Sequence, residues 1–249
     1  MRGLISRRHL LAVTGAAAMT GLMASRRPAG AADTRRVLLI NPNTNKATTE
    51  MMVKIAQAAA PDGIEIAGAT APNGPLMIID PEALAASAPQ VVELGLALGK
   101  DVSGIIISAF GDPGWADLRR QAKVPVVGIA EAAMLAASDK GRRFGVATTT
   151  PKLVASIDAR AAELGLAKLY TGTRVTTEDP NALVADPARL VEALRQVVAT
   201  CIAQDKAEAV IIGGGPLGNA AIALTPMFSI PVIAPIPAAV QRMVRLVGK

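Results

Sequence analysis

Two segments rich in short polar side chains are the first candidates for binding a small ligand. Asn41-Pro42-Asn43-Thr44-Asn45 and Thr148-Thr149-Thr150-Pro151 each follow an apolar run and precede a helical run. At such places free backbone N–H groups and the positive end of a helix dipole favour a carboxylate or an imide oxygen. Plain helix capping by Thr44 and Thr150 is the alternative. Because the two segments occupy equivalent positions, we expect substrate contacts from Asn41, Asn43, Thr44, Thr148 and Thr149.

Two glycine-containing segments follow later apolar runs. Residues 108–114 are Ser-Ala-Phe-Gly-Asp-Pro-Gly, and residues 213–218 are Gly-Gly-Gly-Pro-Leu-Gly. Glycine lets a ligand approach the backbone closely, and consecutive N–H groups can bind an anion. Neither segment matches a P-loop or a dinucleotide-binding fingerprint, and tight turns are the alternative explanation. The substrate contacts expected here are Ser108, Ala109, Phe110, Gly214 and Gly215.

The supply of imidazoles and thiols limits the chemistry further. His9 is the one histidine of the chain and Cys201 the one cysteine. Once a leader containing His9 is removed, the chain has no histidine and one cysteine. This excludes a Ser-His-Asp or Cys-His catalytic site, a zinc site built from His and Cys, and an internal disulfide. A metal would need oxygen ligands alone, and no carboxylate cluster suggests one. We therefore expect no metal and no other cofactor.

Residues 1–31 are typical of an export signal. Ser6-Arg7-Arg8-His9-Leu10-Leu11 resembles the twin-arginine motif, an apolar stretch continues to Ala24, and Ala29-Gly30-Ala31 fits a cleavage site. The stretch is shorter than the ~20 residues of a membrane-spanning helix. We expect a periplasmic protein that starts near Ala32 and has no membrane contact after cleavage. A basic, disordered tail or an uncleaved anchor is the alternative.

The basic charge of the chain belongs to this leader. The chain holds 26 basic and 20 acidic residues. The leader has five arginines and no acid, which leaves 21 basic against 20 acidic residues in the remainder. Aromatic residues make up only 2% of the chain, too few for platforms that stack bases. Composition thus excludes a nucleic-acid partner.

The elements that carry these segments repeat within the chain. Val37–Ile40 matches Phe144–Ala147, and Ile105–Ile107 matches Val210–Ile212, at nearly constant spacing. Two further pairs are 64–67 with 167–170 and 125–127 with 231–233. Short apolar runs that alternate with helical runs indicate parallel strands and crossover helices. We expect an α/β fold with two similar parallel-sheet lobes, related by a pseudo-twofold axis, and a site in the cleft between them.

The lobe boundaries follow from this duplication. Lobe 1 spans residues 32–140, to which the C-terminal helix could also belong, and lobe 2 spans residues 141–249. One continuous, doubly wound sheet is the alternative. Helices are predicted over 48–60, 81–100 and 187–204, with Asp80 and Asp186 as caps of the last two. Cys201, late in the last of these helices, is predicted to be a small buried apolar side chain.

The same segments resemble the Asp/Glu/hydantoin racemase superfamily, and most of all its hydantoin racemase branch. The similarity lies in Ile40–Thr44, Phe110–Gly114, Pro125–Ala133, the strand into Thr148-Thr149 and Ile230–Ile233, in that order. The resemblance implies two α/β lobes with the site between them, no pyridoxal phosphate or metal, and commonly a homo-oligomer. It also implies two cysteines, one in each lobe, that remove and return a proton at the chiral carbon of the substrate.

This chain departs from that pattern at both thiols. The positions that match the two cysteines are Ala109 and Gly214, and Cys201 lies a full strand before the second of them. Neither alanine nor glycine can carry a proton, so the two-thiol mechanism is excluded. The single-thiol reactions of the superfamily, malonate-type decarboxylation and maleate isomerisation, lose their nucleophile as well.

Asp112 and Glu131 are the only acids inside the matched segments. We therefore predict them as the catalytic acid–base pair, with Ser108 orienting a water. A carboxylate is a weak base toward a carbon acid unless burial raises its pKa and donors stabilise the enolate. For Glu131, a carboxylate in the first turn of a helix, facing the helix dipole, is the equal alternative.

Three functions remain. The favoured one is a cofactor-independent racemase or epimerase, an isomerase, that acts on a small amino-acid-like or hydantoin-like compound. The second is a periplasmic protein that binds a small carboxylate or cyclic imide on a racemase fold without catalysis. The third is an interaction or structural protein with an unused cleft.

Overall fold

The computed structural model describes residues 34–248, which contain two parallel sheets of four strands each. The first sheet has the strand order β2-β1-β3-β4, and the second has the equivalent order β6-β5-β7-β8. The strands of the first sheet are β1 (Arg35–Asn41), β2 (Ile64–Thr70), β3 (Gly104–Ile107) and β4 (Val126–Gly128). The strands of the second sheet are β5 (Phe144–Thr148), β6 (Tyr170–Val175), β7 (Ala209–Ile212) and β8 (Val232–Ile233). The duplicated α/β fold is therefore confirmed, and a single continuous sheet is not formed.

One predicted strand is displaced along the chain. The repeat placed it at 167–170, whereas β6 begins at Tyr170, which pairs with Phe144. Residues 166–170 instead form a turn in which the N–H groups of Leu169 and Tyr170 both donate to the Leu166 carbonyl. The strand takes up the following residues, among which Thr171, Thr173 and Val175 are β-branched.

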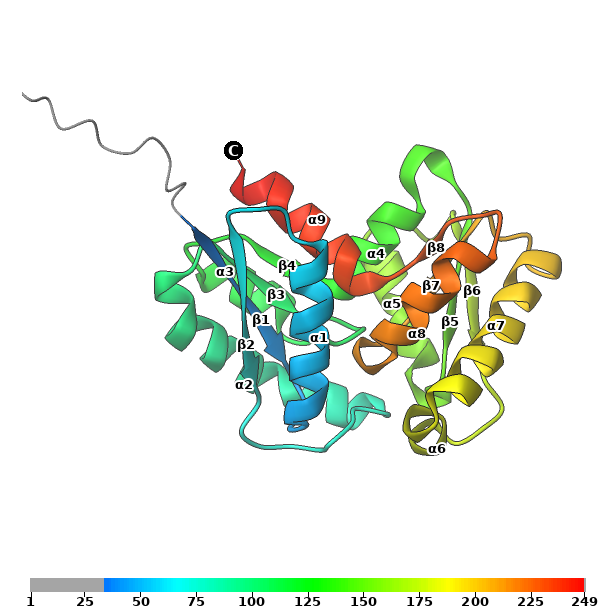
Figure 1. Cartoon of the computed structure of the whole chain (residues 1–249), viewed down its shortest axis with the longest axis horizontal. Helices are drawn as coiled ribbons and strands as arrows, with labels where there is room; N and C mark the ends of the chain where they lie inside the picture. The colour runs from blue at the N-terminus through cyan, green and yellow to red at the C-terminus, as the bar shows by residue number, and fades with distance from the viewer. Residues whose placement is uncertain (1–33, 249) are drawn as a thin grey trace, which may run out of the picture. The chain divides into compact units, whose positions relative to one another are not determined.

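Helices connect the strands and cover the sheets (Figure 1). In the first half they are α1 (Lys46–Ala59), α2 (Pro81–Leu98), α3 (Trp115–Gln121) and α4 (Ile129–Ala137). In the second half they are α5 (Val154–Glu163), α6 (Pro180–Ala185), α7 (Pro187–Ala203), α8 (Gly218–Leu224) and α9 (Pro235–Val247). None of the helices within residues 34–248 is both long and apolar enough to cross a membrane.

Capping residues account for where two long helices begin. Asp80 accepts a hydrogen bond from the Ala83 N–H at the start of α2, and Asp186 accepts one from the Arg189 N–H at the start of α7. Both predicted caps are thus confirmed. The cap of α1 is Asn45, which accepts from the Thr48 N–H, and Thr44 plays no such part. Thr150 precedes a short 3-10 helix (Pro151–Leu153) without a side-chain cap bond.

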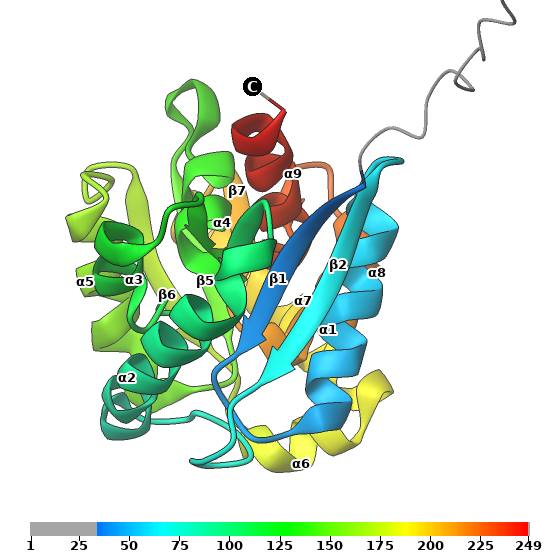
Figure 2. The same ribbon diagram turned by 90° about the vertical axis from the view of Figure 1, so that its left-hand side faces the viewer.

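Alternating strand residues divide the interior into three apolar clusters. Val37, Leu39 and Ile106 of the first sheet share one cluster with Val146 and Ile211 of the second. The opposite face of the first sheet packs against α2 and α3, and that of the second against α7 and α8. Figure 2 shows α1 and α2 on opposite sides of β1 and β2. The two halves therefore share a central core.

The helices α4 and α9 fill the space between the sheets. Ala133, Met134, Val240 and Met243 of these helices belong to the shared cluster and are fully or almost fully buried. Although α9 is the last element, it packs against α1, β3 and β4 of the first half. Each half thus depends on the other for part of its core. The predicted export signal, residues 1–31, lies outside the described residues.

Candidate active site

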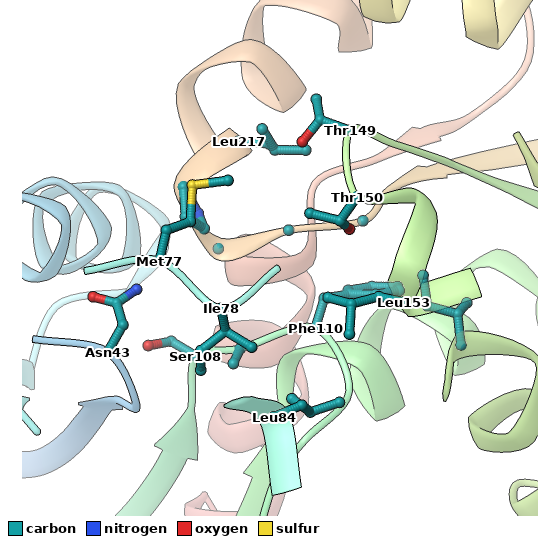
Figure 3. A pocket seen from close by; sticks show the side chains of 16 residues that line it. Asn43, Met77, Ile78, Leu84, Ser108, Phe110, Thr149, Thr150, Leu153 and Leu217 are labelled. Atoms are coloured by element: carbon teal, nitrogen blue, oxygen red, sulfur yellow. The ribbon is translucent and has the colours of Figure 1, made fainter. Parts of the chain in front are cut away.

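A pocket lies at the carboxyl ends of the central strands, where ligands bind in open α/β sheets. It has about 540 Å³ of space not filled by protein atoms, its open mouth included. Its walls come from both halves of the chain (Figure 3). The first half contributes Asn43, Met77, Ile78, Leu84, Ser108, Ala109 and Phe110, and the second Thr149, Thr150, Leu153, Ile157 and residues 213–217.

Most of the predicted substrate contacts meet in this pocket. Asn43 and Ser108 lie on one side of it, and Thr149 lies across the cavity (Figure 3). Ala109, Phe110, Gly214 and Gly215 line it as well. Asn41, Thr44 and Thr148 are not among the residues that line it. The duplication brings these loops together because equivalent strands end at the same edge of each sheet.

Asn43 is held rigidly by the residues behind it. Its Oδ1 accepts from Asn41 Nδ2 (2.9 Å) and from the Asn45 N–H (2.9 Å). Asn41, which is fully buried, also donates to Thr49 Oγ1 at 3.0 Å. These bonds leave Nδ2 of Asn43 without an acceptor within residues 34–248. Asn43 can therefore donate a hydrogen bond to a ligand, while Asn41 positions it.

The hydroxyl groups of the pocket differ in how they are used. Ser108 Oγ donates to the Ile40 carbonyl (2.8 Å) and keeps its acceptor capacity. Thr148 Oγ1 donates to the Gly213 carbonyl (2.7 Å) and lies 3.2 Å from Thr150 Oγ1, so Thr148 supports the loop from behind. The Thr149 hydroxyl has no partner in the part of the chain that the structure describes, and it lines the pocket. Thr44 contacts the Pro75 carbonyl, outside the cavity.

Backbone N–H groups complete the set of donors. The N–H groups of Ala109, Phe110, Gly214 and Gly215 donate to no acceptor in residues 34–248, although all four residues line the pocket. Such unpaired groups are costly in a folded protein unless water or a ligand accepts from them. They can stabilise negative charge that develops on an oxygen of a bound molecule.

No side chain that lines the pocket can titrate near neutral pH. The lining residues are apolar, glycine, proline, serine, threonine or asparagine. The pocket therefore suits an uncharged ligand that offers carbonyl oxygens to the donors and an apolar surface to the walls. Proton transfer by a side chain would have to come from outside this lining.

The two positions that match the thiols of the resembled family face this same space. Ala109 and Gly214 both line the pocket, one from each half. A Cβ atom added at Gly214 would lie 2.9 Å from Cγ and 3.0 Å from Cδ1 of Leu217. Leu217 thus fills the room that a longer side chain at 214 would need.

Asp112 lies behind the pocket and does not line it. Its side chain is fully enclosed, and its Oδ1 and Oδ2 accept from the N–H groups of Ala130 (2.9 Å) and Glu131 (2.8 Å). Arg160 Nε donates to Oδ2 at 3.1 Å. Burial raises the pKa of Asp112 to about 6, although the Arg160 charge and the backbone bonds oppose this. The carboxylate has the pKa of a possible base but no access to the cavity.

Glu131 is also buried and committed to partners. It lies in the first turn of α4, where its Oε2 accepts from Trp115 Nε1 (3.1 Å). Its Oε1 accepts from Arg119 (3.3 Å) and Arg242 (3.0 Å). This geometry matches the alternative of a first-turn carboxylate facing the helix dipole. The predicted catalytic role of Asp112 and Glu131 stays a prediction, and the structure brings neither of them into the pocket.

Cys201 takes no part in this site. It is completely buried in the cluster under α7, which confirms its predicted apolar role. Burial raises the pKa of its thiol to about 12, so a thiolate does not form at neutral pH. Within residues 34–248 no three His, Cys, Asp or Glu residues are grouped so that they could hold a metal ion.

Of the apolar residues that line the pocket, Ala109 and Phe110 were predicted from the sequence and the others were not. Met77 and Ile78 lie on the loop between β2 and α2, and Leu84 lies in the first turns of α2. The topology could have indicated Met77 and Ile78, because every loop that follows a strand of a parallel sheet starts at the same edge of that sheet as the other candidate loops. Leu153, Ile157 and Leu217 could not be assigned in this way, since which face of a helix meets the other half depends on how the halves pack.

Comparisons with known proteins agree with this architecture. The profile of the family described as Asp/Glu/Hydantoin racemase matches residues 37–243. A hydantoin racemase from Pseudomonas sp. (strain NS671) is 30% identical over 83% of this chain and 83% of its own length. An allantoin racemase from Klebsiella pneumoniae has a TM-score of 0.80 at 31% identity and covers 86% of this chain and 88% of its own. An allantoin racemase from Pseudomonas fluorescens has a TM-score of 0.81 at 29% identity, covering 86% and 91%.

Proposed function

Because this chain belongs to the Asp/Glu/hydantoin racemase family, we propose that it is an isomerase of small hydantoin-like cyclic ureides, acting in the pocket between the two sheets. Racemase relatives over more than four-fifths of the chain support the isomerase class. One observation carries the choice of substrate. Both walls offer neutral hydrogen-bond donors and no charged side chain, which suits an uncharged ring with carbonyl groups.

The reaction proposed is exchange of the proton at the chiral ring carbon. Water or hydroxide takes the proton, the electron pair of the broken C–H bond forms a C=C bond to the carbonyl carbon, and the carbonyl π pair moves onto the oxygen. When water returns a proton to either face of the ring carbon, the C=O bond re-forms. The N–H groups of Ala109, Phe110 and Gly214, with Asn43 Nδ2, would stabilise the enolate oxygen. Donors placed where charge develops lower such barriers, by about 3 kcal/mol for one well-placed group.

Proton exchange tests this function directly. The purified chain is incubated in deuterium oxide with one enantiomer of 5-methylhydantoin or of allantoin, and proton NMR and optical rotation follow the chiral carbon. We expect exchange and loss of rotation above the rate without protein, rising with pH as hydroxide increases. Asn43→Ala should slow exchange. The proposal would be overturned if no ureide showed exchange and none raised the melting temperature of the protein.

A binding protein without catalysis is the second candidate. It is favoured by the absence of any titratable side chain among the residues that line the pocket. This function predicts that a cyclic imide or a small carboxylate raises the melting temperature while the proton at its chiral carbon never exchanges. Exchange that depends on Asn43 would exclude it.

The acid–base prediction for Asp112 and Glu131 has its own test. If either carboxylate moves the proton, Asp112→Asn or Glu131→Gln should abolish exchange at saturating substrate while binding persists. Unchanged exchange at saturation in both variants would contradict the catalytic assignment.

We also propose that the protein is exported through the twin-arginine route to the periplasm. The support is the sequence around Arg7 and Arg8 and the small-residue site at Ala29-Gly30-Ala31. Replacing both arginines by lysine in the full chain should keep the protein in the cytoplasmic fraction of a bacterial host. A periplasmic product that starts elsewhere than near Ala32 would contradict the cleavage site. Homo-oligomer formation stays a prediction, for which sedimentation is the measurement.

A further inference from the structure

The loop between β3 and α3 has an unusual backbone. Gly111, Asp112 and Gly114 have φ values of +137°, +50° and +73°. A left-handed conformation is uncommon for residues with a Cβ atom, although aspartate tolerates it better than most, and the partners of its carboxylate stabilise Asp112 in it. The same loop carries Ala109 and Phe110 into the pocket.

The Asp112 carboxylate ties this loop to two other elements. It accepts from the first N–H groups of α4 and from Arg160 of α5. Gly128 leaves room for it, because a Cβ atom there would lie 2.1 Å from Asp112 Cγ. Ile157, one turn before Arg160 on α5, lines the same pocket from the second half of the chain. The ion pair thus joins two elements, one from each half of the chain, that both contribute to the lining of the pocket.

Trp115 lies beside this pair. The Arg160 guanidinium is 4.5 Å from the centroid of the Trp115 ring, and that of Arg119 is 4.7 Å away. Trp115 Nε1 donates to Glu131, which also accepts from Arg242 of α9. Trp115 is the only tryptophan of the chain, so its fluorescence responds to changes around the Asp112–Arg160 pair.

We propose that Asp112 and Arg160 form a clasp that sets the separation of the two pocket walls, which makes Asp112 a positioning residue for ligand binding. In this inference, which rests on the proposed function, the loop 108–114 takes the geometry that binds the ligand only while Asp112 and Arg160 are paired. In some proteins a buried polar or charged group specifies geometry although its burial costs folding free energy.

Protonation of Asp112 should break its ion pair with Arg160. Burial raises the pKa of Asp112 to about 6, and protonation removes the charge that Arg160 pairs with. The charged and titratable groups around the pair are Arg160 and Glu163 of α5, Glu131 of α4, Arg119 and Asp117 of α3 and Arg242 of α9. Glu163 is bound to Arg160 and largely exposed, whereas Glu131 is paired with two arginines.

The first experiment needs neither ligand nor turnover. Trp115 fluorescence of the unliganded protein is followed from pH 4.5 to 8. We expect a transition with a midpoint near 6 that is absent from Asp112→Asn and retained in Asp117→Asn, an exposed aspartate paired with Arg120. A transition that survives in a folded Asp112→Asn, or none in the wild type, would overturn the clasp.

The second experiment separates positioning from proton transfer. Affinity for unsubstituted hydantoin is measured by calorimetry at pH 7.5 for Arg160→Lys, with Arg195→Lys in the exposed pair with Glu192 as control. The clasp predicts that in Arg160→Lys only, binding weakens about tenfold and exchange at saturating 5-methylhydantoin slows without being abolished. Unchanged affinity in Arg160→Lys would contradict it. Failure of exchange in every protein, with the fluorescence transition intact, would instead count against the proposed function alone.

Discussion

At the scale of single residues, the pocket offers hydrogen-bond donors but lacks the proton carriers that the family resemblance implies. Asn43 and Ser108 are oriented by buried partners, while Ala109 and Gly214 bring no functional group. Leu217 occupies the space beside Gly214. The site therefore combines rigid hydrogen bonding with an apolar wall at the place where proton transfer would occur.

Restoring thiols should raise the exchange rate. Ala109→Cys and Gly214→Cys would place two sulfur atoms in one cavity, and Gly214→Cys needs Leu217→Ala beside it because Cβ would lie 2.9 Å from Leu217 Cγ. We expect the triple variant to exchange the chiral proton at least about 100-fold faster than the wild type, the lower end of positioned acid–base catalysis. Leu217→Ala alone is the control. An equal exchange rate in the triple variant and in Leu217→Ala would show that residues 109 and 214 do not face the reacting carbon.

Asp112 should also make stability depend on pH. Its carboxyl ionises near pH 3.8 when unfolded and at about 6 when buried, so the folded state holds the proton more tightly. Its contribution to the free energy of unfolding is therefore full below about pH 4 and lost as pH rises through 6, a change of about 3 kcal/mol. Urea unfolding from pH 4 to 7 should show this loss in the wild type and in Asp117→Asn but not in Asp112→Asn. Parallel curves for all three would contradict the assignment.

At the scale of elements, helix starts decide which loops reach the pocket. Asp80 caps α2 directly after the loop that carries Met77 and Ile78, and Asp186 caps α7 away from the pocket. The two helices begin alike, with an aspartate followed by proline. These two helix starts are therefore a matched pair for testing the effect of a cap, one beside the pocket and one away from it.

Removal of the two caps should separate stability from binding. Asp80→Ala and Asp186→Ala should each lower the free energy of unfolding by about 1 kcal/mol. Only Asp80→Ala should weaken ligand binding as well, because the start of α2 orients Leu84 and the preceding loop. Denaturant unfolding and hydantoin titration of both variants check this. A loss of affinity in Asp186→Ala would show that general destabilisation, and not the α2 loop, is responsible.

At the scale of the whole molecule, the two halves share a core. Leu39 and Val146, which occupy equivalent positions on the two sheets, face the same cluster, and α9 returns to the first half. The lobes are therefore repeats in topology but not independent in packing. Ligand contacts from both halves follow from this arrangement, since the pocket opens where the shared core ends.

The shared core predicts a single unfolding transition. Calorimetry of the chain should give equal calorimetric and van't Hoff enthalpies, because neither half can lose its structure without exposing the cluster between the sheets. Removal of α9, from Pro235 onward, should abolish cooperative unfolding, since it uncovers the cluster to which Val240 and Met243 belong. Two separate transitions would instead show that the two lobes unfold independently.

The duplicated α/β topology, the helix caps at Asp80 and Asp186, the family resemblance and most of the loops that line the pocket could be predicted from the sequence. Each depends on local patterns, such as strand runs at constant spacing or an aspartate before proline, which neighbouring residues largely decide. The position of Asp112 and Glu131 outside the pocket lining could not be predicted in this way, because whether a side chain points into a cavity depends on partners far along the chain. Arg160 is 48 residues from Asp112, and Arg242 is 111 residues from Glu131. Packing between the halves likewise selected Leu153, Ile157 and Leu217 for the wall, a choice that no local pattern encodes.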